Sequence, residues 1–271
     1  MRCHYLSDLH LESQDFQWTL PEGDVLIIAG DLCHARCIDP ARQDKYSIDQ
    51  RTRVMRFVDA ARANFAHVLV VAGNHEHYDG VFEETAGLLR EHLPGLTVLD
   101  NEVAEIDDVR FFGTTLWSDF EGRSAASVNG VRRRLGEYFF VKTRVMGADG
   151  QETLVKFQPE HALAAHDQAW AALLAEVRAG EGKRHVVISH HAPSCQGLNP
   201  MQLGNGLDGA FASNLDGAVM KMGSVVAWVH GHTHIRRVYR IGQTGVYVNC
   251  RGFEGKDPSA RNFAPTAFFD L

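Results

Sequence analysis

Several short runs dominated by apolar residues constrain the fold of this chain more than any other feature. Besides a weaker run at 1–7, they lie at residues 25–29, 67–72, 185–188 and 225–229. Apolar runs of this length are typical of strands that are covered on both faces. Helices are expected between several of them, at about 51–65, 81–92, 159–179 and 208–222. Strands that alternate with helices predict an α/β fold with a largely parallel central sheet.

A polar segment follows each of these runs, at the point where the predicted strand ends. These segments are residues 7–10, 30–31, 73–77, 189–191 and 230–234. Open α/β sheets bind ligands beyond the carboxyl ends of their strands. We therefore expect the polar side chains of all five segments to converge on one site at that edge.

Histidine is concentrated in these segments: the chain has 15 histidines, and eight of them lie there. Neutral imidazole is the commonest metal ligand in proteins. Asp8 and His10 are two residues apart, as are His232 and His234, so in an extended segment each pair leaves the same side of the chain. The complete set of seven nitrogen or oxygen donors is Asp8, His10, Asp31, Asn74, His190, His232 and His234.

Seven donors exceed the four ligands of a tetrahedral zinc ion and suit two cations that share a bridging carboxylate. Their mixture of oxygen and nitrogen is compatible with manganese, iron, zinc or cobalt, of which manganese is our first choice. Two ions about 3.5–4 Å apart match the arrangement for in-line attack on phosphorus by a metal-bridging hydroxide. The net positive charge of such a centre favours an anionic phosphate ester as substrate.

Composition limits the binding partners and the cellular compartment that we expect for this protein. The balance of 27 Lys+Arg against 34 Asp+Glu, a net charge of −7, argues against duplex nucleic acid, which needs a basic face. The five scattered cysteines are an odd number and fit reduced thiols rather than a disulfide framework. Neither a secretory leader nor an apolar stretch of about 18 residues is visible. We therefore expect a cytoplasmic enzyme that acts on a small phosphoester, without a membrane partner.

The five polar segments also carry a family resemblance. Asp8-x-His10, Gly30-Asp31, the run 73–76, His190 and the run 231–234 resemble, in the same order, the five motifs of the calcineurin-like metallophosphoesterases. This resemblance implies a four-layer αββα sandwich, with two mixed β-sheets flanked by helices. Hairpins expected at 103–115 and 237–249 would supply part of the second sheet.

The resemblance also implies a role for each residue of the site. The ligands of the first metal would be Asp8, His10 and His234, those of the second Asn74, His190 and His232, and the bridge Asp31. His75 matches the family histidine that contacts the phosphate and helps the leaving group depart. Of the adjacent pair His190 and His191, the first matches the ligand. The residues expected to contact the substrate are Asn74, His75 and His191.

We interpret residues 1–271 as a single domain with an irregular insertion at about 116–158 that is expected to overhang the active site. Arg132, Arg133 and Arg134 in this insertion form either a solvated face or a surface that steers an anionic substrate. Three further residues of the insertion either line the pocket or pack in the core, namely Trp117, Asp119 and Phe120. Glu76 either hydrogen-bonds a ligand histidine or stands in the first turn of a helix.

These features predict a dinuclear metal-dependent phosphoesterase. A small-molecule phosphodiesterase is the first hypothesis, with cyclic nucleotides as candidate substrates, because the cyclic-nucleotide branch of the family uses this motif series. A phosphomonoesterase or protein phosphatase of the same family is the alternative. A DNA nuclease ranks lower because of the negative net charge. A non-catalytic scaffold also ranks lower, because every expected ligand and His75 are present.

Overall fold

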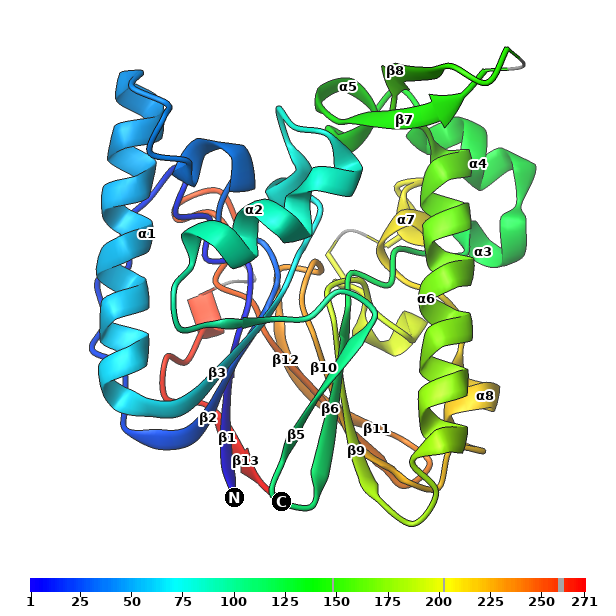
Figure 1. Ribbon diagram of the computed structural model, residues 1–271. Helices are drawn as coiled ribbons and strands as arrows, with labels where there is room; N and C mark the ends of the chain where they lie inside the picture. Colours follow the sequence, from blue (N-terminus) through cyan, green and yellow to red (C-terminus); the bar gives the residue numbers. More distant parts are fainter. Residues whose placement is uncertain (148, 202, 258–260) are drawn as a thin grey trace.

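The computed structural model describes residues 1–147, 149–201, 203–257 and 261–271. Two large mixed sheets lie face to face, and helices cover their outer faces (Figure 1). The first sheet has the strand order β13 (Phe268–Asp270), β1 (Arg2–Leu6), β2 (Gly23–Ala29), β3 (Phe65–Val71), β4 (Thr97–Val98). Its strands are parallel except for β13 at one edge. The four-layer αββα sandwich expected from the sequence is therefore confirmed.

The second sheet contains both hairpins that the sequence predicts. Its order is β11 (Arg236–Ile241), β12 (Thr244–Asn249), β10 (Val225–His230), β9 (Arg184–Ser189), β6 (Val109–Thr114), β5 (Glu102–Ile106). The two edge pairs, β5 with β6 and β11 with β12, are antiparallel, whereas the inner pairs are parallel. The carboxyl ends of the parallel strands of both sheets thus point the same way, toward the top of Figure 1.

Alternating side chains explain why the strand sequences are continuously apolar. In β2, Val25 and Ile27 face the core between the two sheets, whereas Leu26 and Ile28 face the helices. The side chains of strand β9 alternate in the same way. Val186 faces the core between the sheets, and Val187 faces the helix layer that covers the second sheet. Because both faces of these strands are buried, polar residues are confined to the strand ends.

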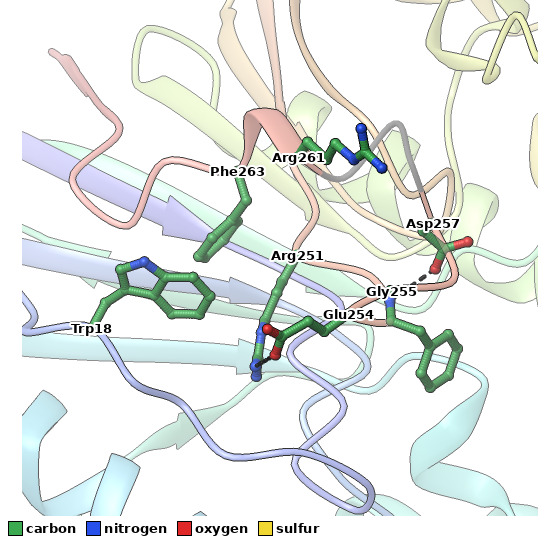
Figure 2. A pocket seen from close by; sticks show the side chains of 8 residues that line it. Trp18, Arg251, Glu254, Gly255, Asp257, Arg261 and Phe263 are labelled. Carbon is green, nitrogen blue, oxygen red and sulfur yellow. Dashed lines mark hydrogen bonds and ion pairs between the residues drawn. The ribbon is translucent and has the colours of Figure 1, made fainter.

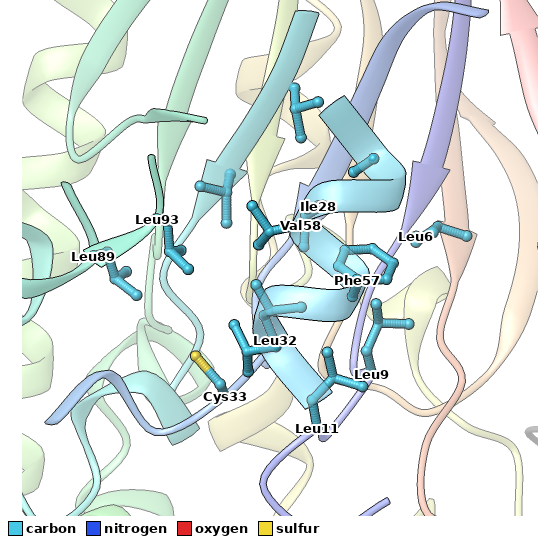
Figure 3. Close-up of a cluster of buried hydrophobic side chains, with 14 of the residues drawn as sticks. Leu6, Leu9, Leu11, Ile28, Leu32, Cys33, Phe57, Val58, Leu89 and Leu93 are labelled. Carbon is cyan, nitrogen blue, oxygen red and sulfur yellow. The ribbon is translucent and has the colours of Figure 1, made fainter. Parts of the chain in front are cut away.

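Helix α1 (Lys45–Asn64) covers the first sheet. It begins where the carboxylate of Asp44 accepts a hydrogen bond from the Ser47 backbone N–H (3.0 Å). Its residues Phe57 and Val58 pack on Ile28 among the buried side chains shown in Figure 3. Helix α2 (Thr85–His92) and the 3-10 turns η1 (Ala35–Ile38), η2 (His75–His77) and η3 (Phe82–Glu84) complete this layer.

Helix α6 (Pro159–Ala179) covers the second sheet and packs against Trp228 and Val187 through residues such as Leu173. The helix expected at 208–222 is wrong: this segment forms α7 (Asp208–Phe211) and α8 (Asp216–Val219), after η4 (Cys195–Gly197). Between the two helices, the Ser213 N–H donates to the carbonyl of Ala192 (3.0 Å). This pairing with the segment after β9 replaces the helical hydrogen bonds there.

The segment 116–158 is built from short elements. These are α3 (Phe120–Arg123), α4 (Ala125–Val131), α5 (Glu137–Phe140) and the antiparallel pair β7 (Lys142–Met146) and β8 (Glu152–Lys156). In Figure 1, α5, β7 and β8 lie above the strand ends, whereas α3 and α4 lie beside the upper part of α6. Among the described residues, no helix has the length and apolarity that crossing a bilayer requires.

Candidate metal centre

The five polar segments predicted from the sequence meet at the carboxyl ends of the strands. Asp31, in the loop after β2, lies between two groups of donors. Its Oδ2 is 3.4 Å from His190 Nε2 on one side and 3.9 Å from His10 Nε2 on the other. The side chain is buried. One carboxylate is thus within reach of both groups.

The first group consists of Asp8, His10 and His234. His234 Nε2 is 3.3 Å from Asp8 Oδ1 and 3.2 Å from His10 Nε2. All three ligand atoms lie within 4.8 Å of one another, a spacing that a single metal ion can span. The two ends of the chain meet here, because Asp8 follows β1 and His234 follows β10.

The second group consists of Asn74, His190 and His232. His190 Nε2 is 3.1 Å from Asn74 Oδ1 and 3.2 Å from His232 Nδ1. Asp31 completes this group as well, within 4.8 Å of both histidines. The structure therefore brings together all seven side chains that the sequence analysis selected as metal ligands, in two groups that share Asp31.

The backbone at this site is strained. Five of the seven residues are non-glycine residues with positive φ, a conformation that costs about 1–3 kcal/mol each and is concentrated at functional sites. They are Asp8 (52°), His10 (49°), Asp31 (53°), His232 (67°) and His234 (49°). The surrounding fold holds these residues in place, and the strain turns their side chains inward from the strand ends.

Two glycines allow the loops to approach one another. A Cβ at Gly30 (φ 85°) would lie 2.4 Å from His190 Nδ1, and one at Gly73 would lie 2.2 Å from Asp31 Oδ1. Both distances are far below van der Waals contact. The glycine before Asp31 and the one before Asn74 are therefore required by the close packing of the site.

Hydrogen bonds orient three of the imidazoles so that Nε2 points into the cluster. The Nδ1 partners are the carboxylate of Glu12 for His10 (2.9 Å), the carbonyl of Ala29 for His190 (2.8 Å) and the carboxylate of Asp257 for His234 (2.7 Å). Such acceptors behind a histidine are typical of metal sites, because they fix the tautomer that leaves Nε2 free to bind the ion. The donor set therefore fits two metal ions.

His75 lies beside the cluster with its own orientation fixed. Its Nδ1 is 3.1 Å from Glu12 Oε1, its ring stacks on Tyr78 at 4.4 Å, and its backbone N–H donates to Asp31 Oδ1. Burial alone lowers the pKa of His75, but the negative charges of Asp31 and Glu12 outweigh it and raise the pKa to about 9. The imidazole is therefore held in the form that can donate a proton.

The neighbouring histidines lower the pKa of two carboxylic acids at the site. Burial alone would raise the pKa of Asp31, yet the neighbouring His190 and His75 hold it well below its ordinary value. The hydrogen bonds of Glu12 to His10 and His75 likewise overcome burial and lower its pKa to about 2. Both carboxylates are thus ionised, as metal ligation and proton orientation require.

Glu76 stands in the first turn of η2, as one of the two sequence alternatives expects, and it has a further role. Its buried carboxylate accepts four backbone hydrogen bonds, from the N–H groups of Asp31 (2.9 Å), Leu32 (2.6 Å), Cys33 (3.1 Å) and Gly73 (2.6 Å). It therefore ties the loop that carries Asp31 to the loop that carries Asn74. Within the described part of the chain, its hydrogen bonds go to these backbone groups and not to a ligand histidine.

His191, expected to contact the substrate, is buried behind the cluster. Its Nδ1 lies 3.3 Å from the carbonyl of Thr115, and its ring centroid is 4.2 Å from that of His232. Trp117 and Phe120 also pack in a buried cluster, as the core alternative for these residues expects. Arg132 forms an ion pair with Glu160, away from the metal ligands.

A cavity of ≈ 280 Å³ opens over the two groups of donors. Its lining includes Arg134 and Glu137 from the segment 116–158, and Phe253 and Asp257 from the C-terminal part of the chain. Glu137 accepts hydrogen bonds from the Tyr78 hydroxyl (3.3 Å) and from Asn74 Nδ2 (3.5 Å), so the amide oxygen of Asn74 faces His190.

Sequence reasoning missed Glu12, Glu137, Phe253 and Asp257. Only Glu12 carried a usable signal, because it continues the two-residue spacing of Asp8 and His10. The other three reach the site from segments far away in sequence, Glu137 from the start of α5 and Phe253 and Asp257 from the C-terminal part of the chain. Phe253, for example, stacks on the His10 ring with centroids 4.0 Å apart.

Comparisons with known sequences show the family of this chain. The family model of the calcineurin-like phosphoesterases matches residues 1–236. A curated relative, an uncharacterized protein of Acanthamoeba polyphaga mimivirus, is 22% identical over 233 residues, covering 80% of this chain and 78% of the relative.

Solved structures share the fold. Phosphopantetheinyl hydrolase from Mycobacterium tuberculosis has a TM-score of 0.60 at 17% identity, with 95% of this chain and 93% of that chain covered. A putative 5'-nucleotidase from Staphylococcus aureus has a TM-score of 0.50 at 16% identity, covering 93% of this chain and 49% of that one. The match to the family model extends over most of the chain, and the protein belongs to the calcineurin-like phosphoesterase family.

Proposed function

We propose that this protein hydrolyses small phosphodiesters with two metal ions. The ligands of one ion would be Asp8, His10 and His234, those of the other Asn74, His190 and His232, and the bridge Asp31. The observation that carries the proposal is that Asp31 Oδ2 lies near a donor of each group, 3.4 Å from His190 Nε2 and 3.9 Å from His10 Nε2. The ligand atoms of Asp8, His10 and His234 lie within 4.8 Å of one another, as do those of Asp31, His190 and His232. Metal dependence of this kind is general for the family.

The ions, when bound, supply Lewis-acid chemistry that polarises the phosphoryl group and lowers the pKa of a water molecule. His75 would donate a proton to the oxygen of the leaving group, and the Glu12 carboxylate at its Nδ1 favours the protonated ring. Glu12 keeps the His75 ring in position through Nδ1. Tyr78 and Glu137 hold the Asn74 amide so that its oxygen, and not its nitrogen, faces the ligand cluster.

The charges around the cavity favour a diester over a monoester. A phosphodiester carries one negative charge, whereas a monoester carries close to two at neutral pH. Arg134 is accompanied in the lining by two carboxylates besides Asp31, those of Glu137 and Asp257. Apart from the metal ions and His75, Arg134 is the one cation among the described residues of the lining, and Glu137 and Asp257 oppose the second charge of a monoester. Cyclic nucleotides are the first natural diesters to test.

The test compares bis-(p-nitrophenyl) phosphate with p-nitrophenyl phosphate after removal of metal with a chelator and reloading with manganese. We expect metal-restored turnover, with kcat/KM higher for the diester. Asp31→Ala should abolish turnover and lower the metal content, whereas Asp59→Ala, on the exposed face of α1, should do neither. Preference for the monoester would overturn the diester proposal. Absence of turnover with two ions bound would favour the scaffold alternative.

A further inference from the structure

A second cavity, of ≈ 200 Å³, lies beside the metal cavity and has no role in the mechanism above (Figure 2). Trp18 and Phe263 form aromatic walls, with their rings 5.2 Å apart in an edge-to-face arrangement. Arg251 and Arg261 supply positive charge to the same lining. Trp18 is 41% exposed, an unusual position for the largest apolar side chain.

Arg251 is buried without enough hydrogen-bond partners. Its exposed fraction is 4%, and its guanidinium lies 5.0 Å from the centre of the Trp18 ring. Only Nη1 donates a hydrogen bond, to the carbonyl of Leu9 (3.1 Å), while Nε and Nη2 have no hydrogen-bond partner among the described residues. A buried guanidinium with unused donors is costly unless an acceptor binds to it.

One carboxylate stands near these donors but leaves them available. Glu254 Oε2 is 3.7 Å from Arg251 Nη2, beyond hydrogen-bond distance, and the Glu254 side chain is 73% exposed. Only the Glu254 end of this ion pair is exposed, and its carboxylate makes no hydrogen bond to Arg251. An anionic ligand can therefore displace Glu254 into solvent at small cost and pair with Arg251 in two-donor geometry.

The second cavity adjoins the metal cavity. Phe253 and Asp257 line both, and Asp257 also binds Nδ1 of His234. Small-molecule sites have volumes of about 300–1,000 Å³. Neither cavity reaches this range alone, whereas the two together do. A substrate with its phosphodiester at the metal ligands can thus place the rest of its structure beside Trp18.

We propose that the cavity lined by Trp18, Arg251 and Phe263 is a substrate-specificity subsite for a flat ring joined to an anionic group, either a carboxylate or a phosphate. The ring contacts the aromatic walls, and the anionic oxygens take the unused donors of Arg251. This inference rests on the proposed phosphodiesterase function, which places the reacting phosphorus in the neighbouring cavity. Arg261, at the mouth of the subsite, adds a second positive charge.

Binding to the metal-stripped protein tests the subsite independently of catalysis. The probes are phenylacetate, phenylphosphonate and the neutral phenylacetamide, titrated while protein fluorescence or NMR shifts are recorded. We expect both anions to bind at least tenfold more tightly than the amide. Their relative affinities distinguish a carboxylate from a phosphate-like ligand. Equal binding of the amide and the anions, or no binding of any probe, would overturn the proposal.

Three variants assign this preference to named residues. Arg251→Met should make the anions and the amide bind about equally. Arg261→Met should reduce the preference for anions by a smaller factor, and it leaves the hydrogen bond from Arg251 to the Leu9 carbonyl in place. Trp18→Leu should weaken all three probes alike. The matched control is Arg240→Met, because Arg240 lies on the edge strand β11 and outside the lining of this cavity. Preference for anions that survives both Arg251→Met and Arg261→Met would contradict the assignment.

Kinetics then connects the subsite to the reaction. Alkyl p-nitrophenyl phosphodiesters that end in a phenyl group, with or without a ring carboxylate, are compared over several linker lengths on the manganese-loaded enzyme. At one linker length, we expect kcat/KM to be at least tenfold higher for the ester with the ring carboxylate than for the ester without it. In Arg251→Met, the two esters should have similar kcat/KM. Turnover of every ester without any such ratio would overturn the subsite but leave the phosphodiesterase proposal intact. Anion binding to the subsite without turnover of any ester would overturn the phosphodiesterase proposal but leave the subsite intact.

Discussion

At the scale of single residues, the proposed roles of the metal ligands and of His75 differ, and this difference can be tested. His75→Ala should retain both metal ions, because no ligand role is assigned to this side chain. Its kcat should fall about 10²–10⁴-fold for alkyl esters, which need a proton on the departing oxygen. For p-nitrophenyl esters the loss should be much smaller. Turnover across leaving groups of graded pKa, with metal content measured by mass spectrometry, tests this. Loss of metal would show that His75 is a ligand.

Buried His77 predicts the pH dependence of stability. It packs on Phe82 and bonds to Thr85, and burial lowers its pKa to about 3 from an ordinary value of 6.5. Between these values the unfolded chain binds a proton that the folded chain does not, so stability falls as the pH falls below 6.5. The contribution is about 1.4 kcal/mol per pH unit.

His77→Gln should remove this contribution. Urea unfolding of the metal-stripped protein at pH 7.5 and at successively lower pH should show a steeper loss of stability for the wild type than for the variant. The difference in slope should approach about 1.4 kcal/mol per pH unit below pH 6. Parallel curves for the two proteins would mean that His77 protonates in the folded state.

At the scale of elements, Glu76 connects the loops after β2 and β3, and this connection can be measured. Glu76→Gln keeps one acceptor oxygen but brings an NH₂ group toward backbone N–H donors. We expect a loss of about 3 kcal/mol in the free energy of unfolding, because buried donors lose a charged partner. Glu91→Gln is the control, since Glu91 is 72% exposed, and should change stability by less than about 0.5 kcal/mol. Equal unfolding midpoints for the two variants would contradict the role of Glu76.

The elements, and the convergence of the candidate site residues, were predictable where local sequence determines them. The strands around Ile28 and Val187 could be predicted because burial on both faces leaves a continuous apolar run. Asp31 and Asn74 could be predicted because polar residues directly after such strands must lie at the sheet edge. The break in the segment 208–222 could not, because it depends on pairing with Ala192. Asp257 could not either, because it reaches His234 across 23 residues of chain.

At the scale of the whole molecule, net charge determines how strongly a nucleic acid can bind. The net charge is −7, and arginines of the insertion are already paired, Arg132 with Glu160 and Arg144 with Glu84. We expect duplex DNA to bind more weakly than about 10⁻⁴ M at 150 mM salt, the weak end of non-specific binding. Fluorescence anisotropy with a labelled 20-base-pair duplex measures this. Micromolar affinity that falls steeply with added salt would favour the nuclease alternative.

The central claim is that one carboxylate, Asp31, joins two metal sites built from opposite ends of the chain. Electron paramagnetic resonance of the manganese-loaded protein tests it most directly, because two Mn²⁺ ions that share a bridging ligand are magnetically coupled. We predict two ions per chain and a coupled spectrum in the wild type, and loss of the coupling in Asp31→Ala. One ion per chain, or two ions with the six-line spectrum of isolated Mn²⁺, would contradict the account.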